Sequence, residues 1–267
     1  SPALTAAAFG FLSAVFFGLN PVVAKKGLER GGTSVQAAMV VITTTAVLVW
    51  AGLLATEGLG AFSDFSPLGI AVFLLGGIVG TTLGRLTNFA GIDRIGASVS
   101  TAVMNTRPFF AVALAAGFLG ESVTLTTAGG VLFIVVGVVV LSLAKGGDIR
   151  GWETTDLVFP IVAAFFFGAG NVIRRLGFLL TPATTLEALT LNETAALITL
   201  GAYFLTVRRD RIRTASRAAV PYFVLSGAIV TCGLASLFVG LGVGPVVVVD
   251  PLMGMAPLFS TLFTYLF

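Results

Sequence analysis

The chain has 267 residues, of which 57% are hydrophobic and 10% are charged, and its net charge is +3. Soluble domains carry about 25% charged residues, so this composition excludes that class and predicts an integral membrane protein. There is no histidine and a single cysteine, Cys232, which excludes imidazole metal sites, Ser-His catalysis and internal disulfides. We therefore expect no metal and no cofactor.

Apolar stretches long enough to cross a membrane, for which a helix needs about 20 residues, follow one another along the chain. They are continuous and lack the alternating pattern of an outer-membrane barrel, so the sequence predicts an all-α membrane bundle. The expected spans are Ala3–Ala24, Val35–Ala55, Leu68–Ala90, Ala97–Leu119, Leu125–Ala144, Leu157–Ile173, Leu186–Val207, Val220–Leu241 and Val246–Phe267.

The third span carries a glycine at every fourth position, Gly76, Gly80 and Gly84. On a helix these form one stripe, which in lipid lets two backbones pack closely. Arg85 and Asn88 lie on a neighbouring face. Arg85 either contacts a substrate carboxylate or phosphate, or extends to the nearby membrane surface.

The fourth span has Arg107-Pro108 near its middle. An arginine at that depth is costly unless it faces protein, water or a counter-charge, and the proline frees a backbone carbonyl that the bundle must satisfy. We favour substrate binding by Arg107 over a structural ion pair, and we expect Asn105 to line the same interior.

Two carboxyl groups lie within later spans. Glu193, near the middle of the seventh, either binds a proton or is the counter-charge of an arginine. Asp250 precedes Pro251 one to two turns into the ninth span, where it either faces the interior or caps a helix start. We predict that Arg107, Glu193 and Asp250 face one interior cavity.

The amides of Asn20 and Asn171, near the cores of the first and sixth spans, either line that cavity or bridge helices. The predicted site therefore has two groups of residues. Those expected to bind substrate are Arg107, Arg85, Asn88, Asn105, Asn20 and Asn171, and those expected to couple protons or balance charge are Glu193 and Asp250.

An internal repeat is visible. Ser13 to Gly18 resembles Ala163 to Gly168, and Pro108 aligns with Pro257 at nearly the same spacing. We expect two five-helix repeats, residues 1–150 and 151–267, which insert with opposite orientation because five is odd. Since Phe267 aligns with about Phe118, we expect the second repeat to lack its last helix in this chain, and a tenth helix to follow Phe267.

These features resemble the drug/metabolite transporter superfamily, in its EamA-like branch of ten-helix carriers. The resemblance implies a secondary transporter that moves a small polar or amphipathic metabolite by alternating access, most often an exporter of amino acids or related metabolites. A flippase for lipid-linked carriers is the alternative, and an intramembrane enzyme is less favoured. The matching residues are Phe17-Gly18, Asn20, Lys25, Gly80 to Gly84, Arg94-Ile95-Gly96-Ala97, Pro108 and Phe118-Leu119-Gly120-Glu121-Ser122.

Lysine and arginine gather in the loops after the first, third, fifth and seventh spans, whereas the opposite loops are expected to carry only Arg174 and Arg175. This bias places the basic loops in the cytoplasm and the N-terminus outside. The basic run Arg208 to Arg217 is interpreted as a solvated anchor and not as a nucleic-acid patch. We expect a multi-pass protein of the cytoplasmic membrane, a monomer or homodimer, with a small-molecule substrate, lipid contacts and no nucleic-acid partner.

Overall fold

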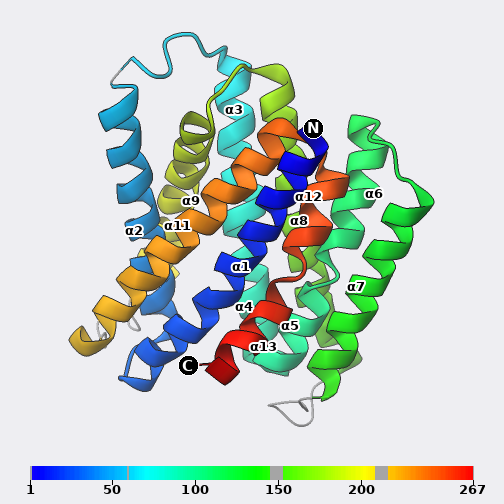
Figure 1. Ribbon diagram of the computed structural model, residues 1–267. Helices are drawn as coiled ribbons and strands as arrows, with labels where there is room; N and C mark the ends of the chain where they lie inside the picture. Colours follow the sequence, from blue (N-terminus) through cyan, green and yellow to red (C-terminus); the bar gives the residue numbers. More distant parts are fainter. Residues whose placement is uncertain (1, 59, 145–152, 208–215, 267) are drawn as a thin grey trace.

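A computed structural model of the protein describes residues 2–58, 60–144, 153–207 and 216–266 (Figure 1). These residues form helices and connecting turns without any strand, so the predicted all-α membrane fold is confirmed. Eight helical segments among them are long and apolar enough to cross a membrane. The remaining predicted span, residues 125–144, is the apolar helix α7 (Leu125–Ala144).

Successive spans run in alternating directions through the bundle, with α2 and α9 on one side, α6 and α7 on the other, and α1, α11 and α12 between them (Figure 1). The other elements in chain order are α1 (Pro2–Glu29), α2 (Ser34–Thr56), α3 (Pro67–Gly76), the π-helix η1 (Gly77–Leu83), α4 (Gly84–Ile95), α5 (Ala97–Met104), α6 (Arg107–Leu119), the 3₁₀ turn η2 (Thr154–Leu157), α8 (Val158–Leu180), α9 (Thr185–Val207), the 3₁₀ turn η3 (Arg217–Ala219), α11 (Val220–Val243), α12 (Val246–Met253) and α13 (Ala256–Leu266).

Three of the predicted spans are interrupted within the bundle. The third contains η1, the fourth breaks between α5 and α6, and the ninth breaks between α12 and α13. Both α6 and α13 carry a proline in their first turn, Pro108 and Pro257. A proline is tolerated there because the first N–H groups of a helix have no partner within that helix.

The sixth span is longer than predicted. It was expected to end at Ile173, but α8 continues to Leu180, so Arg174 and Arg175 lie inside a helix. The prediction that these two arginines lie in a loop is therefore wrong. A count of charges treats every arginine as exposed, whereas Arg174 is buried and finds its acceptors inside the bundle.

The glycine stripe of the third span brings α3, η1 and α4 against α8; the stripe predicted close packing but did not identify this partner. A Cβ atom built on Gly170 would lie 2.2 Å from the Cα of Gly80, and one built on Gly84 would lie 3.0 Å from the Phe167 ring. On the other side, a Cβ on Gly77 would lie 2.1 Å from the backbone oxygen of Asn192 in α9. Because these glycines have no side chain, the third span can pack closely against both α8 and α9.

The described parts of the basic loops lie at one end of the bundle. The end of α1, the end of α4 and the start of α11 lie there, at the bottom of Figure 1. The repeat boundary and basic segment between Lys145 and Arg150, and most of the run from Arg208 to Arg217, lie outside the described residues. That this end faces the cytoplasm stays a prediction.

The contact between Gly80 and Gly170 makes the fold sensitive to one added methyl group. We expect Gly170→Ala to lower the free energy of unfolding by about 1–3 kcal/mol through overpacking. The midpoint temperature of unfolding of the detergent-solubilised protein, measured by size exclusion, should fall accordingly. The control is Gly117→Ala in α6, where an added Cβ meets nothing within 4 Å and alanine favours the helix. Equal stability of the two variants would contradict the packing described here.

Candidate functional site

A buried arginine on α8 connects three segments of the bundle. The side chain of Arg174 donates from Nη1 to Oδ1 of Asn171 at 2.7 Å, from Nε to Oδ1 of Asn192 at 2.9 Å, and from Nη2 to Oγ1 of Thr81 at 2.9 Å. The carbonyl oxygen of Gly76 lies 3.5 Å from Nη2. Every nitrogen of this guanidinium therefore has an acceptor, which is the condition for burying the charge.

The local backbone makes room for that side chain. A Cβ on Gly76 would lie 3.2 Å from Cγ of Arg174, and one on Gly80 would lie 2.9 Å from its Nη2. Both glycines lie at or within the π-helical turn, a conformation that is frequent at functional sites. The same glycine stripe thus allows close packing and leaves space for Arg174.

On one side the network reaches a carboxylate of α12. Nδ2 of Asn171 donates to Oδ1 of Asp250, and Nε of Arg107 lies 3.3 Å from each carboxylate oxygen. Asp250 is fully buried, and the side chain of Arg107 is 12% exposed. The amide of Asn171 therefore links Arg174 to the Arg107–Asp250 ion pair.

On the other side the network reaches a carboxylate of α9. Nδ2 of Asn192 donates to Oε1 of Glu193 at 2.8 Å. Glu193 is fully buried, and its Oε2 has no hydrogen-bond partner among the described residues. Arg85 and Arg174 both lie within electrostatic range of Glu193. The two amides, Asn171 and Asn192, thus connect one arginine to two carboxylates.

Three side chains of this region have donors that the described part of the chain does not satisfy. The hydrogen bond and ion pair of Arg107 both use Nε, so its two terminal amino groups remain open. The guanidinium of the half-buried Arg85 makes no hydrogen bond to a described residue, and Nδ2 of Asn105 is buried without a partner. Such donors match a carboxylate or another anionic group.

Two predicted site residues make their hydrogen bonds outside this network. Asn88 on α4 accepts a hydrogen bond from Ser100 on α5 at 3.3 Å. Asn20 on α1 accepts one from Ser226 on α11. The structure therefore brings together Arg107, Asp250, Asn171 and Glu193 through hydrogen bonds, and adds Arg85 through its charge.

The interpretation of Asp250 as a helix cap is wrong. The helix α12 begins at Val246, so Asp250 lies a full turn inside it. Glu121 of the Gly-Glu motif occupies the start of α12 instead, accepting hydrogen bonds from the N–H groups of Val246 and Val247 at 3.0 Å each. A carboxylate there satisfies open donors and complements the positive end of the helix.

Arg174 and Asn192 were not among the predicted site residues. Arg174 follows Asn171 by three positions and so shares its helix face, and Asn192 directly precedes Glu193. These spacings are weak signals, because the acceptors of Arg174 on η1 and α9 are 93 and 18 residues distant in the chain.

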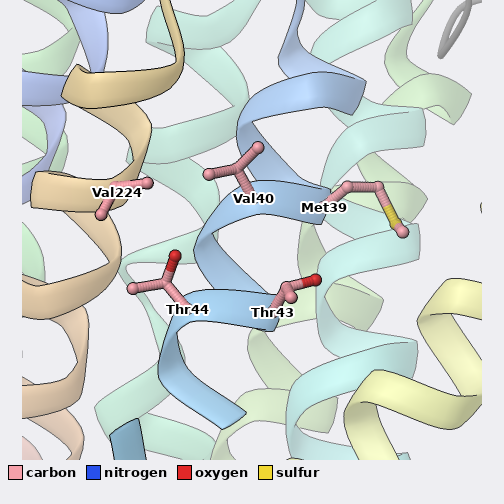
Figure 2. A pocket seen from close by; sticks show the side chains of 5 residues that line it. All are labelled: Met39, Val40, Thr43, Thr44 and Val224. Carbon is pink, nitrogen blue, oxygen red and sulfur yellow. The ribbon is translucent and has the colours of Figure 1, made fainter. Parts of the chain in front are cut away.

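A separate groove lies between α2 and α11 (Figure 2). Its volume is about 310 Å³, and it is lined by Met39, Val40, Thr43, Thr44 and Val224. It contains no charged side chain, so it offers none of the donors found around Arg174.

The fold and this network together define a multi-pass membrane protein with a charged interior site. A profile of the EamA-like transporter family matches residues 4–143, which is more than half of the chain. The chain belongs to the EamA-like transporter family, as the resemblance implied.

Two further comparisons agree with this family. A curated protein of Clostridium kluyveri described as an uncharacterized transporter is 28% identical over 151 residues, which are 55% of this chain and 48% of that protein. The match thus spans about half the length of that relative. A crystal structure of another protein superposes with a TM-score of 0.79 over 98% of this chain and 87% of that one, at 17% identity, which shows a shared fold alone.

The central position of Arg174 predicts a large effect on stability. We expect Arg174→Met to cost about 3–5 kcal/mol, because it leaves a buried network of acceptors without its donor, and to reduce both the folded yield and the midpoint temperature. The control is Arg94→Met, because the Arg94 side chain is 54% exposed in its 3.4 Å ion pair with Asp156, and a pair exposed in this way contributes about 1 kcal/mol or less. A stable Arg174→Met protein would show that the network is dispensable for folding.

Proposed function

We propose that the protein is a secondary transporter that moves a small polar metabolite with a carboxylate group, such as an amino acid, out of the cell by alternating access. The observation that carries this proposal is the charge balance of the buried network. Arg174 lies within electrostatic range of two arginines and two carboxylates, namely Arg85, Arg107, Glu193 and Asp250. Positive charge is therefore in excess, which favours an anionic group of a substrate.

The free donors indicate where such a group would bind. Arg174 uses its nitrogens on protein acceptors, whereas Arg85 and the terminal amino groups of Arg107 remain open. A guanidinium grips a carboxylate through two parallel hydrogen bonds. Glu193 adds an unpaired carboxylate oxygen nearby.

Alternating access is supported by the arrangement of the network across the predicted repeats. Thr81, Arg85 and Arg107 belong to residues 1–150, and Arg174 and Asp250 to residues 151–267. The breaks between α5 and α6 and between α12 and α13 fall at corresponding positions of the two segments. In carriers built from inverted repeats, broken helices at the repeat interface form the substrate site.

The flippase alternative requires a lateral opening beside Phe165 to Phe167. At this seam the ring centroids of Phe110 and Phe165 are 6.0 Å apart in edge-to-face contact, and Phe167 packs against Gly84. These contacts favour a central site over a lateral one.

The proposal is tested by efflux assays in vesicles across amino acids, organic acids and sugars. We expect Arg107→Ala to abolish transport, and Arg107→Lys to restore little, because lysine keeps the charge but not the planar fork. Arg107→Ala alone leaves the buried carboxylate of Asp250 without its partner, which destabilises the protein. Combining it with Asp250→Asn removes the same guanidinium without leaving a buried charge unpaired. Normal transport by this double variant would remove Arg107 from the substrate site.

Proton coupling is proposed for Glu193, because a buried carboxyl with one free oxygen is suited to gain and lose a proton. We expect Glu193→Gln to retain exchange of substrate across the vesicle membrane but to lose its response to an imposed proton gradient. The glutamine keeps an oxygen for the amide of Asn192, which makes it a conservative change. Wild-type flux that ignores the proton gradient would contradict this role.

A further inference from the structure

A hollow of about 490 Å³ lies at the basic end of the bundle, apart from the network around Arg174. It is lined by Lys26, Glu29 and Arg30 at the end of α1 and by Tyr222 at the start of α11. These two helix ends lie side by side at the bottom of Figure 1. The hollow is therefore at the level where the apolar part of α1 gives way to charged residues.

Close backbone packing builds this hollow. A Cβ on Gly27 would lie 2.5 Å from the ring of Phe223, and one on Gly32 would lie 2.6 Å from it. Because neither glycine has a side chain, α1 can approach α11 closely, and the guanidinium carbon of Arg30 lies 4.1 Å from the centroid of the Tyr222 ring. That cation–π contact orients the arginine.

The charged side chains of the hollow differ in whether they have a partner. The carboxylate of Glu29 pairs with Lys25 at 3.7 Å. Neither the ammonium of Lys26 nor the guanidinium of Arg30 has an ion pair or hydrogen bond with a described residue, and the guanidinium lies over the face of the Tyr222 ring. No side chain in the described part of the chain occupies the donors of Lys26 and Arg30, and together they suit an anion with several oxygen atoms.

We propose that this hollow binds the phosphate of an anionic phospholipid, held between Lys26 and Arg30. Tyrosine is enriched at the membrane–water interface, as Tyr222 is placed here. Leu225, one turn further into the membrane on α11, is 52% exposed and offers an apolar surface to the first methylene groups of an acyl chain. Anionic leaflets also attract basic residues near their surface.

The proposed lipid site is separate from the proposed substrate site, and a lipid bound there would contact both predicted repeats at once. Lys26 and Arg30 belong to residues 1–150, and Tyr222 and Leu225 to residues 151–267. A bound lipid would thus stabilise the contact between α1 and α11 without touching the proposed substrate site.

The test uses the purified chain, equilibrated with equal amounts of phosphatidylglycerol and phosphatidylcholine of identical acyl chains and analysed by native mass spectrometry. We expect the wild type to retain phosphatidylglycerol preferentially. We expect Lys26→Gln and Arg30→Gln each to lower that retention about fivefold, and the double variant roughly 25-fold. Lys26→Arg keeps the charge and is expected to retain the lipid.

The matched control is Arg94→Gln, which removes one exposed positive charge at the same end of the bundle and is expected to leave retention unchanged. The site is wrong if the double variant retains phosphatidylglycerol as the wild type does, or if Arg94→Gln loses it equally. Displacement of the lipid by an equal concentration of inorganic phosphate would overturn the lipid assignment in favour of a soluble anion.

Discussion

A guanidinium buried among apolar helices is the constraint on which the interior of this protein depends. Hydrocarbon offers no water, so Arg174 is stable only where protein oxygens surround it. Those oxygens come from η1, α8 and α9, and these three segments must approach closely to supply them. The glycines at positions 76, 77, 80 and 170 are the residues that allow that approach. Packing and charge satisfaction are therefore the same requirement at this point of the bundle.

Once Arg174 is fixed, the arrangement of the other charges follows. The Asn171 and Asn192 amides accept from Arg174 and pass a hydrogen bond on to Asp250 and Glu193. Each carboxylate is thereby held in place by the hydrogen bond of one amide, although Glu193 keeps one oxygen without a partner among the described residues. The guanidinium of Arg174 is occupied by the acceptors of this network, so the donors that remain open are those of Arg85 and Arg107, which we propose as the substrate contacts. The excess of positive charge is thus a property of the folded interior.

The class of fold could be predicted because continuous apolar runs are a strong signal, and the Gly76, Gly80 and Gly84 stripe correctly indicated close packing. The break before Arg107 and the length of α8 could not be predicted with the same rules. Hydropathy ends a span where charges begin, but Arg174 is compensated by Thr81 and Asn192, which lie in other helices. Periodicity along one helix carries no information about such partners. For this reason the residues with open donors were predicted, whereas the residue that organises them was not.

The contacts at the two ends of α11 differ from those in the network around Arg174. At the far end of α11, Nη1 of Arg175 donates to the Leu241 carbonyl oxygen at 2.8 Å, while Glu121, with an oxygen 4.0 Å from Nε of Arg175, binds the start of α12. The positive Arg175 lies at the partly negative C-terminal end of α11, and the negative Glu121 lies at the partly positive N-terminal end of α12. At the basic end, the close packing of Gly27 on Phe223 leaves charged donors open. The alternating access that we propose, if it preserves the network around Arg174, alters the contacts at these ends. Because Arg175 binds the end of α11 and Glu121 binds the start of α12, an opening of that end in the proposed transport cycle would have to move both helices as one unit or break these contacts.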